Sequence, residues 1–127
     1  MNGIAKGVMV AGLLLSPMGA NAALTVVPGL TVHNQCPYDL IIAVHYQGSG
    51  GHWATAPFAT IRGKERKDSV ISTDNSIIYY YAESSSGVRW TGNHNFSVGG
   101  KTYPMKEARL NLDQERNRYY LGLTCNH

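Results

Sequence analysis

The sequence predicts an all-β fold, a small antiparallel β-sandwich or barrel of about seven or eight short strands closed by one disulfide. Clusters of Gly, Ser, Asn and Asp recur at short intervals, and the runs between them are rich in β-branched and aromatic residues. Only two cysteines are present in the 127 residues. The turn-forming clusters occupy residues 48–51, 62–64, 74–76, 84–87 and 99–100.

The expected strands show an alternation that places every second side chain on one face. Residues 39–46 put Leu40, Ile42 and Val44 on the same face. Residues 77–82 (IIYYYA) are apolar on both faces, which is typical of a central strand. Strands are expected at residues 30–34, 39–46, 77–82, 96–98 and 119–125.

The segment 104–112 fits both a helix and a strand. Three of its apolar residues have helical spacing, and Pro104 is suited to the first turn of a helix. Leu110 and Leu112 instead alternate, and the five polar residues 113–117 would close a hairpin with the strand that follows. We therefore expect a strand here.

Residues 1–22 are predicted to be a secretory signal peptide, cleaved after Ala22 to leave residues 23–127 as a single β domain. Lys6 supplies the positive charge, residues 8–15 (VMVAGLLL) supply the apolar stretch, and an Ala-Asn-Ala site precedes the cut. This stretch is too short for stable membrane insertion, which takes about 20 apolar residues. We expect a periplasmic or secreted protein.

The cysteine pair predicts a disulfide between Cys36 and Cys125, because an even count in an exported domain favours bonding. Closing a loop of about 90 residues removes denatured-state entropy on the order of 4–5 kcal/mol. A Cys-His metal site would need two more ligands at local spacing, and the five histidines show no such spacing. We expect no metal and no cofactor.

The charge balance argues against a nucleic-acid partner. The formal net charge is +3, whereas nucleic-acid binding calls for a strongly basic patch. The densest run of charge, residues 62–67 (RGKERK), is interpreted as a solvated turn between strands, with an anion site as the alternative.

Several short motifs occur in a fixed order between residues 30 and 126. They are Asn34-Gln35-Cys36, Ile42-Ala43-Val44-His45-Tyr46, Trp53, Tyr79-Tyr80-Tyr81-Ala82-Glu83, Trp90-Thr91-Gly92 and Leu121-x-Leu123-x-Cys125-Asn126. In this order they resemble the bacterial family called domain of unknown function 1036. The resemblance implies a fold type and no activity. The sequence departs from the family pattern because it lacks additional cysteines and a Gly-Trp-Trp after the Trp53 region.

No catalytic motif is present, and we expect that the protein is not an enzyme. The serines gather in turns, no G-x-S-x-G elbow occurs, and the Ser and His of loop 48–52 are interpreted as a hairpin tip. The carboxylates are scattered along the chain. Glu83 is the least ordinary of them, because it ends the apolar run IIYYYA, and a strand-end salt bridge or hydrogen bond is expected there.

The aromatic residues are the best candidates for binding. Eight Tyr and two Trp are a heavy load for a small core, so some rings are expected at the surface. We predict an exposed patch of Trp90, Arg89 and Tyr81, and we place Trp53 in the core, although its glycine-rich loop keeps it among the binding candidates. A meander of strands would put the two Trp loops at opposite ends of the domain.

The sequence favours a small exported binding module, a monomer that engages an unknown protein in the cell envelope or outside the cell. One alternative is a protein that binds a carbohydrate such as a cell-wall glycan, and another is an inhibitor or immunity protein for an envelope enzyme. A third is a hydrolase that uses Glu83 and a histidine.

Overall fold

The structure, a computed structural model, describes residues 27–125. Apart from a short 3-10 turn, η1 (Ser49–Gly51), every regular element in this range is a strand, which confirms the predicted all-β fold. The predicted signal peptide lies outside the described residues. The strands are β1 (Gly29–Asn34), β2 (Leu40–Gln47), β3 (Trp53–Ile61), β4 (Arg66–Lys67), β5 (Ile77–Ser84), β6 (Arg89–Trp90), β7 (His94–Val98), β8 (Lys101–Arg109), β9 (Leu112–Asp113) and β10 (Arg118–Leu123).

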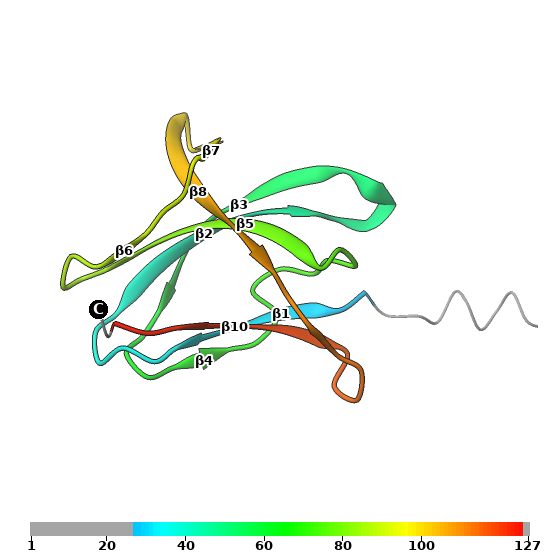
Figure 1. The fold of residues 1–127 in the computed structure, drawn as a ribbon, viewed down its shortest axis with the longest axis horizontal. Coiled ribbons are helices and arrows are strands. Elements are labelled where there is room, and N and C mark those ends of the chain that lie inside the picture. Colours follow the sequence, from blue (N-terminus) through cyan, green and yellow to red (C-terminus); the bar gives the residue numbers. More distant parts are fainter. Residues whose placement is uncertain (1–26, 126–127) are drawn as a thin grey trace, which may run out of the picture.

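The strands form two sheets, which lie one above the other in Figure 1. The smaller sheet has the order β4-β1-β10-β9, and the larger one has the order β3-β2-β5-β8-β7, with β6 paired to β5. This order is not a meander. The first and last long strands, β1 and β10, pair in parallel, so the predicted antiparallel pattern has one exception in the described residues.

Ten strands are present between residues 27 and 125, more than the seven or eight expected. The difference comes from β4, β6 and β9, which have two residues each and form only because a longer strand lies beside them. Segment 104–112 belongs mostly to strand β8, so the strand prediction is confirmed there. The polar residues 113–117 close the hairpin of β9 and β10, also as expected.

The main core lies between the two sheets. Its side chains come from the alternating positions of β1, β2, β5 and β10, which is the alternation that the sequence displays. The fully or nearly buried members include Leu30, Val32, Leu40, Ile42, Val44, Ile61, Ile78, Ala82, Trp90, Leu121 and Leu123.

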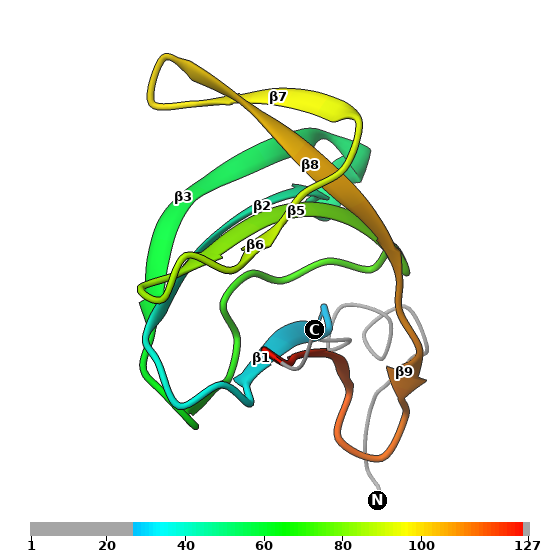
Figure 2. The same ribbon diagram turned by 60° about the vertical axis from the view of Figure 1, so that its left-hand side comes forward.

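A second cluster, the barrel core, lies on the other face of the six-stranded sheet. Figure 2 shows that the β7–β8 hairpin folds back above β2, β3 and β5, so this sheet curls into a half-barrel in which β3 approaches β7. Four buried residues form its centre, and four aromatic residues pack against them. The cluster consists of Ala43, Tyr81, Val98 and Met105 with Phe58, Tyr79, Phe96 and Tyr103.

A β-bulge in β3 helps the sheet to curl. Ile42 pairs with Ala59 and Val44 pairs with Ala56, so β3 carries one residue more than β2 over this stretch. The extra residue coincides with Pro57, which has no N–H to give to a ladder and is tolerated at bulges.

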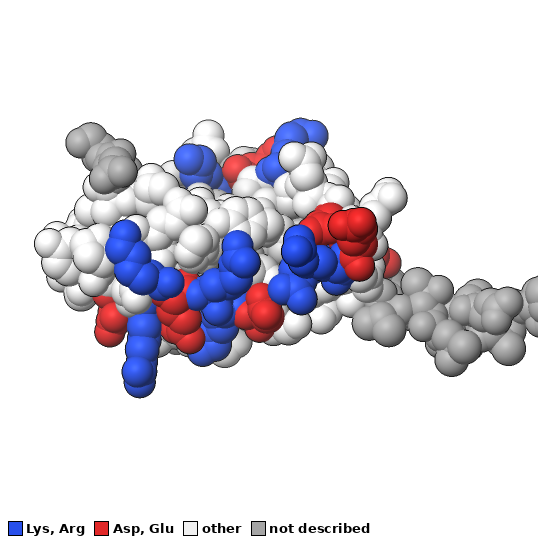
Figure 3. Space-filling model, turned by 90° about the horizontal axis from the view of Figure 1, so that it is seen from below, with Lys and Arg blue, Asp and Glu red and all other residues white. Residues whose placement is uncertain are grey.

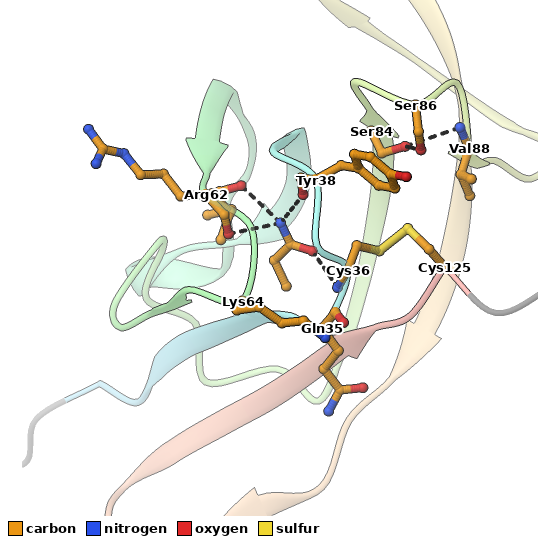
Figure 4. Close-up of a disulfide and its surroundings, with 11 residues drawn as sticks. Gln35, Cys36, Tyr38, Arg62, Lys64, Ser84, Ser86, Val88 and Cys125 are labelled. Atoms are coloured by element: carbon orange, nitrogen blue, oxygen red, sulfur yellow. Dashed lines mark hydrogen bonds between the residues drawn. A yellow bond between two sulfur atoms is a disulfide. The ribbon is translucent and has the colours of Figure 1, made fainter.

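The disulfide between Cys36 and Cys125 is confirmed, and it joins the chain just after β1 to the chain just after β10 (Figure 4). Beside it, the buried side chain of Asn34 ties the two sheets together. The Asn34 Nδ2 lies 2.8 Å from the carbonyl oxygen of Tyr38, 3.1 Å from that of Ile61 and 2.9 Å from that of Arg62. The Asn34 Oδ1 accepts a hydrogen bond from the Cys36 N–H at 2.9 Å.

Candidate functional site

One open end of the half-barrel forms a groove of about 330 Å³, which we call the aromatic groove. Strands β2, β3, β5, β6 and β8 each contribute to it. Its lining residues are Ile41, Phe58, Tyr81, Glu83, Arg89, Thr91, Lys101, Thr102, Tyr103 and Pro104. A smaller hollow of about 220 Å³ shares Ile41 and Glu83 with the groove and so continues it along β2.

Three aromatic rings make the apolar wall of the groove. The ring of Phe58 meets Tyr103 at 5.0 Å between centroids and Tyr81 at 6.1 Å, both edge to face. Tyr81 and Tyr103 lie 5.0 Å apart with a tilt of 54°. Such edge-to-face contacts are favourable, and because each ring touches the other two, the wall is fixed before any ligand arrives.

Charged groups stand at the mouth of the groove. The Tyr81 hydroxyl donates a hydrogen bond of 2.9 Å to Glu83 Oε1, and Arg89 Nε lies 3.8 Å from the same oxygen. Burial, reinforced by this hydrogen bond, raises the pKa of Tyr81 above its ordinary value. Lys101 Nζ lies 5.4 Å from the ring centroid of Tyr103. A carboxylate, a guanidinium and an ammonium therefore surround one apolar wall.

The structure brings Arg89 and Tyr81 together, as the predicted patch requires, but Trp90 lies elsewhere. Trp90 is only 9% exposed and belongs to the main core, so its predicted exposure is wrong. Strand β6 pairs with β5, which sets Trp90 opposite the core residue Ala82 and Arg89 opposite Glu83. Alternation along β6 then sends Trp90 inward and Arg89 to the groove.

The predicted burial of Trp53 is also wrong, because 43% of this residue is exposed. Trp53 opens β3 and pairs with Gln47 at the far end of β2. Trp90 pairs with Ala82 near the end of β5, and Ala82 lies beside Ile42 near the start of β2, so the two tryptophans do lie at opposite ends of the sheet, as expected. The reasons for that placement are the pairing partners, not a meander.

Trp53 belongs to an aromatic stack at the other end of the half-barrel. The His45 ring lies between two others, 5.3 Å from Trp53 and 3.7 Å from Phe96, with an interplanar angle of 16° to each. Thr55 Oγ1 is 2.7 Å from His45 Nδ1. Burial lowers the pKa of His45 below 6.5, which favours the neutral imidazole in this stack.

The chemistry available in the groove is recognition by rings and charges. Glu83 is its one carboxylate, and none of its lining residues is a histidine. Within residues 27–125 no group of three or more His, Cys, Asp or Glu residues is placed to hold a metal ion.

Sequence reasoning missed Phe58, Tyr103 and Lys101. Phe58 follows the proline of the β3 bulge, where the alternation of the strand is interrupted. Lys101 and Tyr103 lie in β8 ahead of Leu110 and Leu112, the two residues whose alternation predicted a strand in this segment. The one available signal was the phase of β8, in which Lys101, Tyr103 and Met105 share a face. Their meeting with Tyr81 depends on the pairing of β5 with β8.

Comparison with known proteins gives no relative for this chain: no family model, no curated protein and no solved structure matches it. Over the described residues, the chain contains no helix of the length and apolarity that a membrane crossing requires.

Proposed function

We propose that this protein is an exported, non-catalytic binding module that takes a segment of a saccharide, such as a cell-wall glycan, into the aromatic groove. The observation that carries the proposal is the fixed wall of Phe58, Tyr81 and Tyr103 with charged hydrogen-bonding groups at its mouth. The resemblance to the domain of unknown function 1036 is compatible with this proposal and adds no ligand to it.

A saccharide suits the groove because its rings have both apolar C–H faces and hydroxyl edges. The aromatic wall can pack against the C–H faces. Glu83 can accept hydrogen bonds from the hydroxyl groups, and Arg89 and Lys101 can donate hydrogen bonds to them. A concave site of a few hundred Å³ with few polar groups is of the size that small ligands use, whereas protein partners bury about 800 Å² of a broad surface.

Binding without turnover is favoured by the shortage of catalytic groups. Glycoside hydrolysis commonly uses two carboxyl groups that flank the scissile bond about 5–9 Å apart. The groove itself has one carboxylate, Glu83, which already accepts a hydrogen bond from Tyr81. A second carboxylate, Asp39, lines the adjoining hollow, where it accepts a hydrogen bond from the Gly63 N–H at 3.0 Å.

A protein partner is the second candidate, and the exposed Trp53 favours it. Large rings that are held rigid lose little entropy on binding and are common anchors of protein interfaces. The stack on His45 holds Trp53 in this way. This candidate also includes an inhibitor or immunity protein.

Export is supported by the signal-like residues 1–22 and by the disulfide, which persists in oxidising compartments. Mass spectrometry of protein made by its native host should find Ala23 at the amino terminus. Recovery of a chain that begins at Met1 would contradict export.

Binding to soluble peptidoglycan fragments, measured by calorimetry, tests the groove. We expect Arg89→Ala and Tyr103→Leu each to weaken binding by about tenfold, because they remove a donor and a stacking ring. Arg109→Ala is a matched control, since Arg109 also pairs with a carboxylate across the strand surface but lies outside the groove. Incubation with the same fragments should release no new reducing ends.

Three results would contradict the proposal: no binding at millimolar fragment, equal loss in the Arg109→Ala control, or steady release of reducing ends that Glu83→Gln abolishes. Capture of a defined envelope protein that Trp53→Ala prevents, with the groove variants unaffected, would instead support the second candidate.

A further inference from the structure

The outer face of the four-stranded sheet, on the opposite side of the main core from the groove, contains a cleft of about 230 Å³ that we call the basic cleft. Figure 3 views the molecule from this side and shows a row of Lys and Arg side chains with acidic side chains between them. Three of the six lining residues are arginines and one is an aspartate: Thr31, Arg66, Asp113, Arg116, Arg118 and Tyr120.

Tyr120 forms a fixed base for this cleft. Its ring lies close to Gly122, where a Cβ would be only 3.2 Å from the Cε2 atom and from the hydroxyl oxygen of Tyr120. Its hydroxyl is 2.7 Å from His33 Nδ1 on the neighbouring strand, so the ring is held although the residue is 40% exposed. The guanidinium of Arg66 stacks over this ring, with Cζ 5.4 Å from the centroid.

Arg66 is therefore positioned by an aromatic ring and not by a carboxylate. No ion pair of residues 27–125 includes it. Arg118 lies 2.9 Å from Asp68, and Arg116 lies 3.1 Å from Asp113, but these pairs are exposed. Exposed pairs contribute little and exchange easily with another anion. The cleft thus contains the guanidinium of Arg66, which has no carboxylate partner among the described residues. Beside it are the guanidinium groups of Arg116 and Arg118, which a bound anion can draw away from their exposed carboxylate partners.

The charged run 62–67 lies beside the cleft at the edge of the same sheet. Residues 62–65 form the turn between strands β3 and β4 that the sequence predicts, and residues 66–67 form strand β4 beside β1. Lys67 pairs with the buried Val32, so its side chain lies on the inner side of the sheet edge, where its Nζ is 3.4 Å from the carbonyl oxygen of Thr60. Arg62 and Lys64 take part in no ion pair among the described residues. Together with Arg66 they form a row of cations along the sheet edge, which would suit repeated anionic groups along a chain.

We propose that the basic cleft and this row bind the phosphate groups of a phosphorylated polysaccharide. Guanidinium groups match phosphate oxygens with two parallel hydrogen bonds, which makes arginine the suited residue for a tetrahedral oxyanion. Sparse phosphates fit better than nucleic acid, because duplex DNA presents one charge per roughly 1.7 Å and the acidic residues among these cations would oppose it. The proposal does not depend on the aromatic groove.

Binding of dextran phosphate, with unmodified dextran as the neutral polymer, tests the proposal at 50 and 200 mM salt. We expect binding to dextran phosphate alone, and at least tenfold weaker binding at the higher salt. Arg66→Gln and Arg118→Gln should each weaken it by about tenfold. Arg66→Lys should recover only part of the loss, since lysine keeps the charge and loses the planar fork. Lys106→Gln, on β8, removes the same charge elsewhere and should change little.

Several outcomes would overturn the inference: no binding at 50 mM salt, an equal effect of Lys106→Gln, or tighter binding to a 20-base-pair duplex or to vesicles with 30% anionic lipid. Unchanged melting temperatures of the variants would show that any loss reflects contact and not unfolding. Peptidoglycan binding by these variants reports separately on the groove, so the two proposals can fail independently.

Discussion

Trp90 fills the main core from a strand of only two residues. It is 9% exposed and packs with the buried side chains of β1, β2, β5 and β10. A large ring in this position cannot be removed without leaving a cavity that the surrounding strands fill only in part.

We therefore predict that Trp90→Ala lowers the free energy of unfolding by about 3–5 kcal/mol, as measured by denaturant titration. Trp53→Ala is the matched control, and it should cost clearly less because Trp53 is 43% exposed. Equal losses in the two variants would show that Trp90 is not a core residue.

His45 makes the stability of the folded domain depend on pH. Burial lowers its pKa below 6.5 in the folded state, so the folded state resists protonation more than the unfolded state does. The associated stability is present above pH 6.5 and is lost as the pH falls from 6.5 through the folded pKa.

We predict that the melting temperature of the native protein falls between pH 7 and pH 5, and that His45→Gln removes part of this fall. The comparison of the two pH profiles isolates His45 from the other titrating groups. Parallel profiles for the two proteins would contradict the role of His45.

At the scale of elements, the half-barrel depends on close approach of the chain that leads into β7. Gly92 lies against β8, and a Cβ there would collide with the carbonyl oxygen of Met105. Its N–H donates to the carbonyl of Pro104 at 3.2 Å. Any larger residue has to push this connection away from β8, beside the groove residues Thr91 and Pro104.

Gly92→Ala should therefore destabilise the domain by about 1–3 kcal/mol, which is the usual range for overpacking. Gly48→Ala is the control, because the nearest atom to a Cβ at Gly48 is 3.7 Å away. Thermal unfolding of both variants checks this, and a neutral Gly92→Ala would mean that the connection yields freely.

The long strands could be predicted from the sequence because alternation is a local property. Strands β1, β2, β5 and β10 overlap the expected ranges, and the phase of β10 correctly pointed Cys125 toward the core. The short strands could not be predicted, because a pair of residues such as Arg89 and Trp90 is too short to show an alternation of apolar and polar side chains. Which way their side chains face, and with it the place of Arg89 in the groove, is set by pairing with β5.

At the scale of the whole molecule, the disulfide spans 89 residues and closes nearly the entire described domain. Cys36→Ser should lower the free energy of unfolding by about 2–5 kcal/mol. Denaturant titration of the native protein with and without reductant provides the comparison. A midpoint that neither reduction nor the substitution shifts would contradict a stabilising bond.

The parallel pairing of β1 with β10 also governs when the domain can be completed. The four-stranded sheet needs residues 29–34 and 118–123 side by side, so a nascent chain lacks one side of its main core until residues 118–123 have been synthesised. Pairing over such a separation is entropically costly to begin and slows folding. We therefore expect the order of the strands to keep a ribosome-bound chain of this protein from folding early. An unfolded chain is the form that can pass through a membrane channel during the export that we propose.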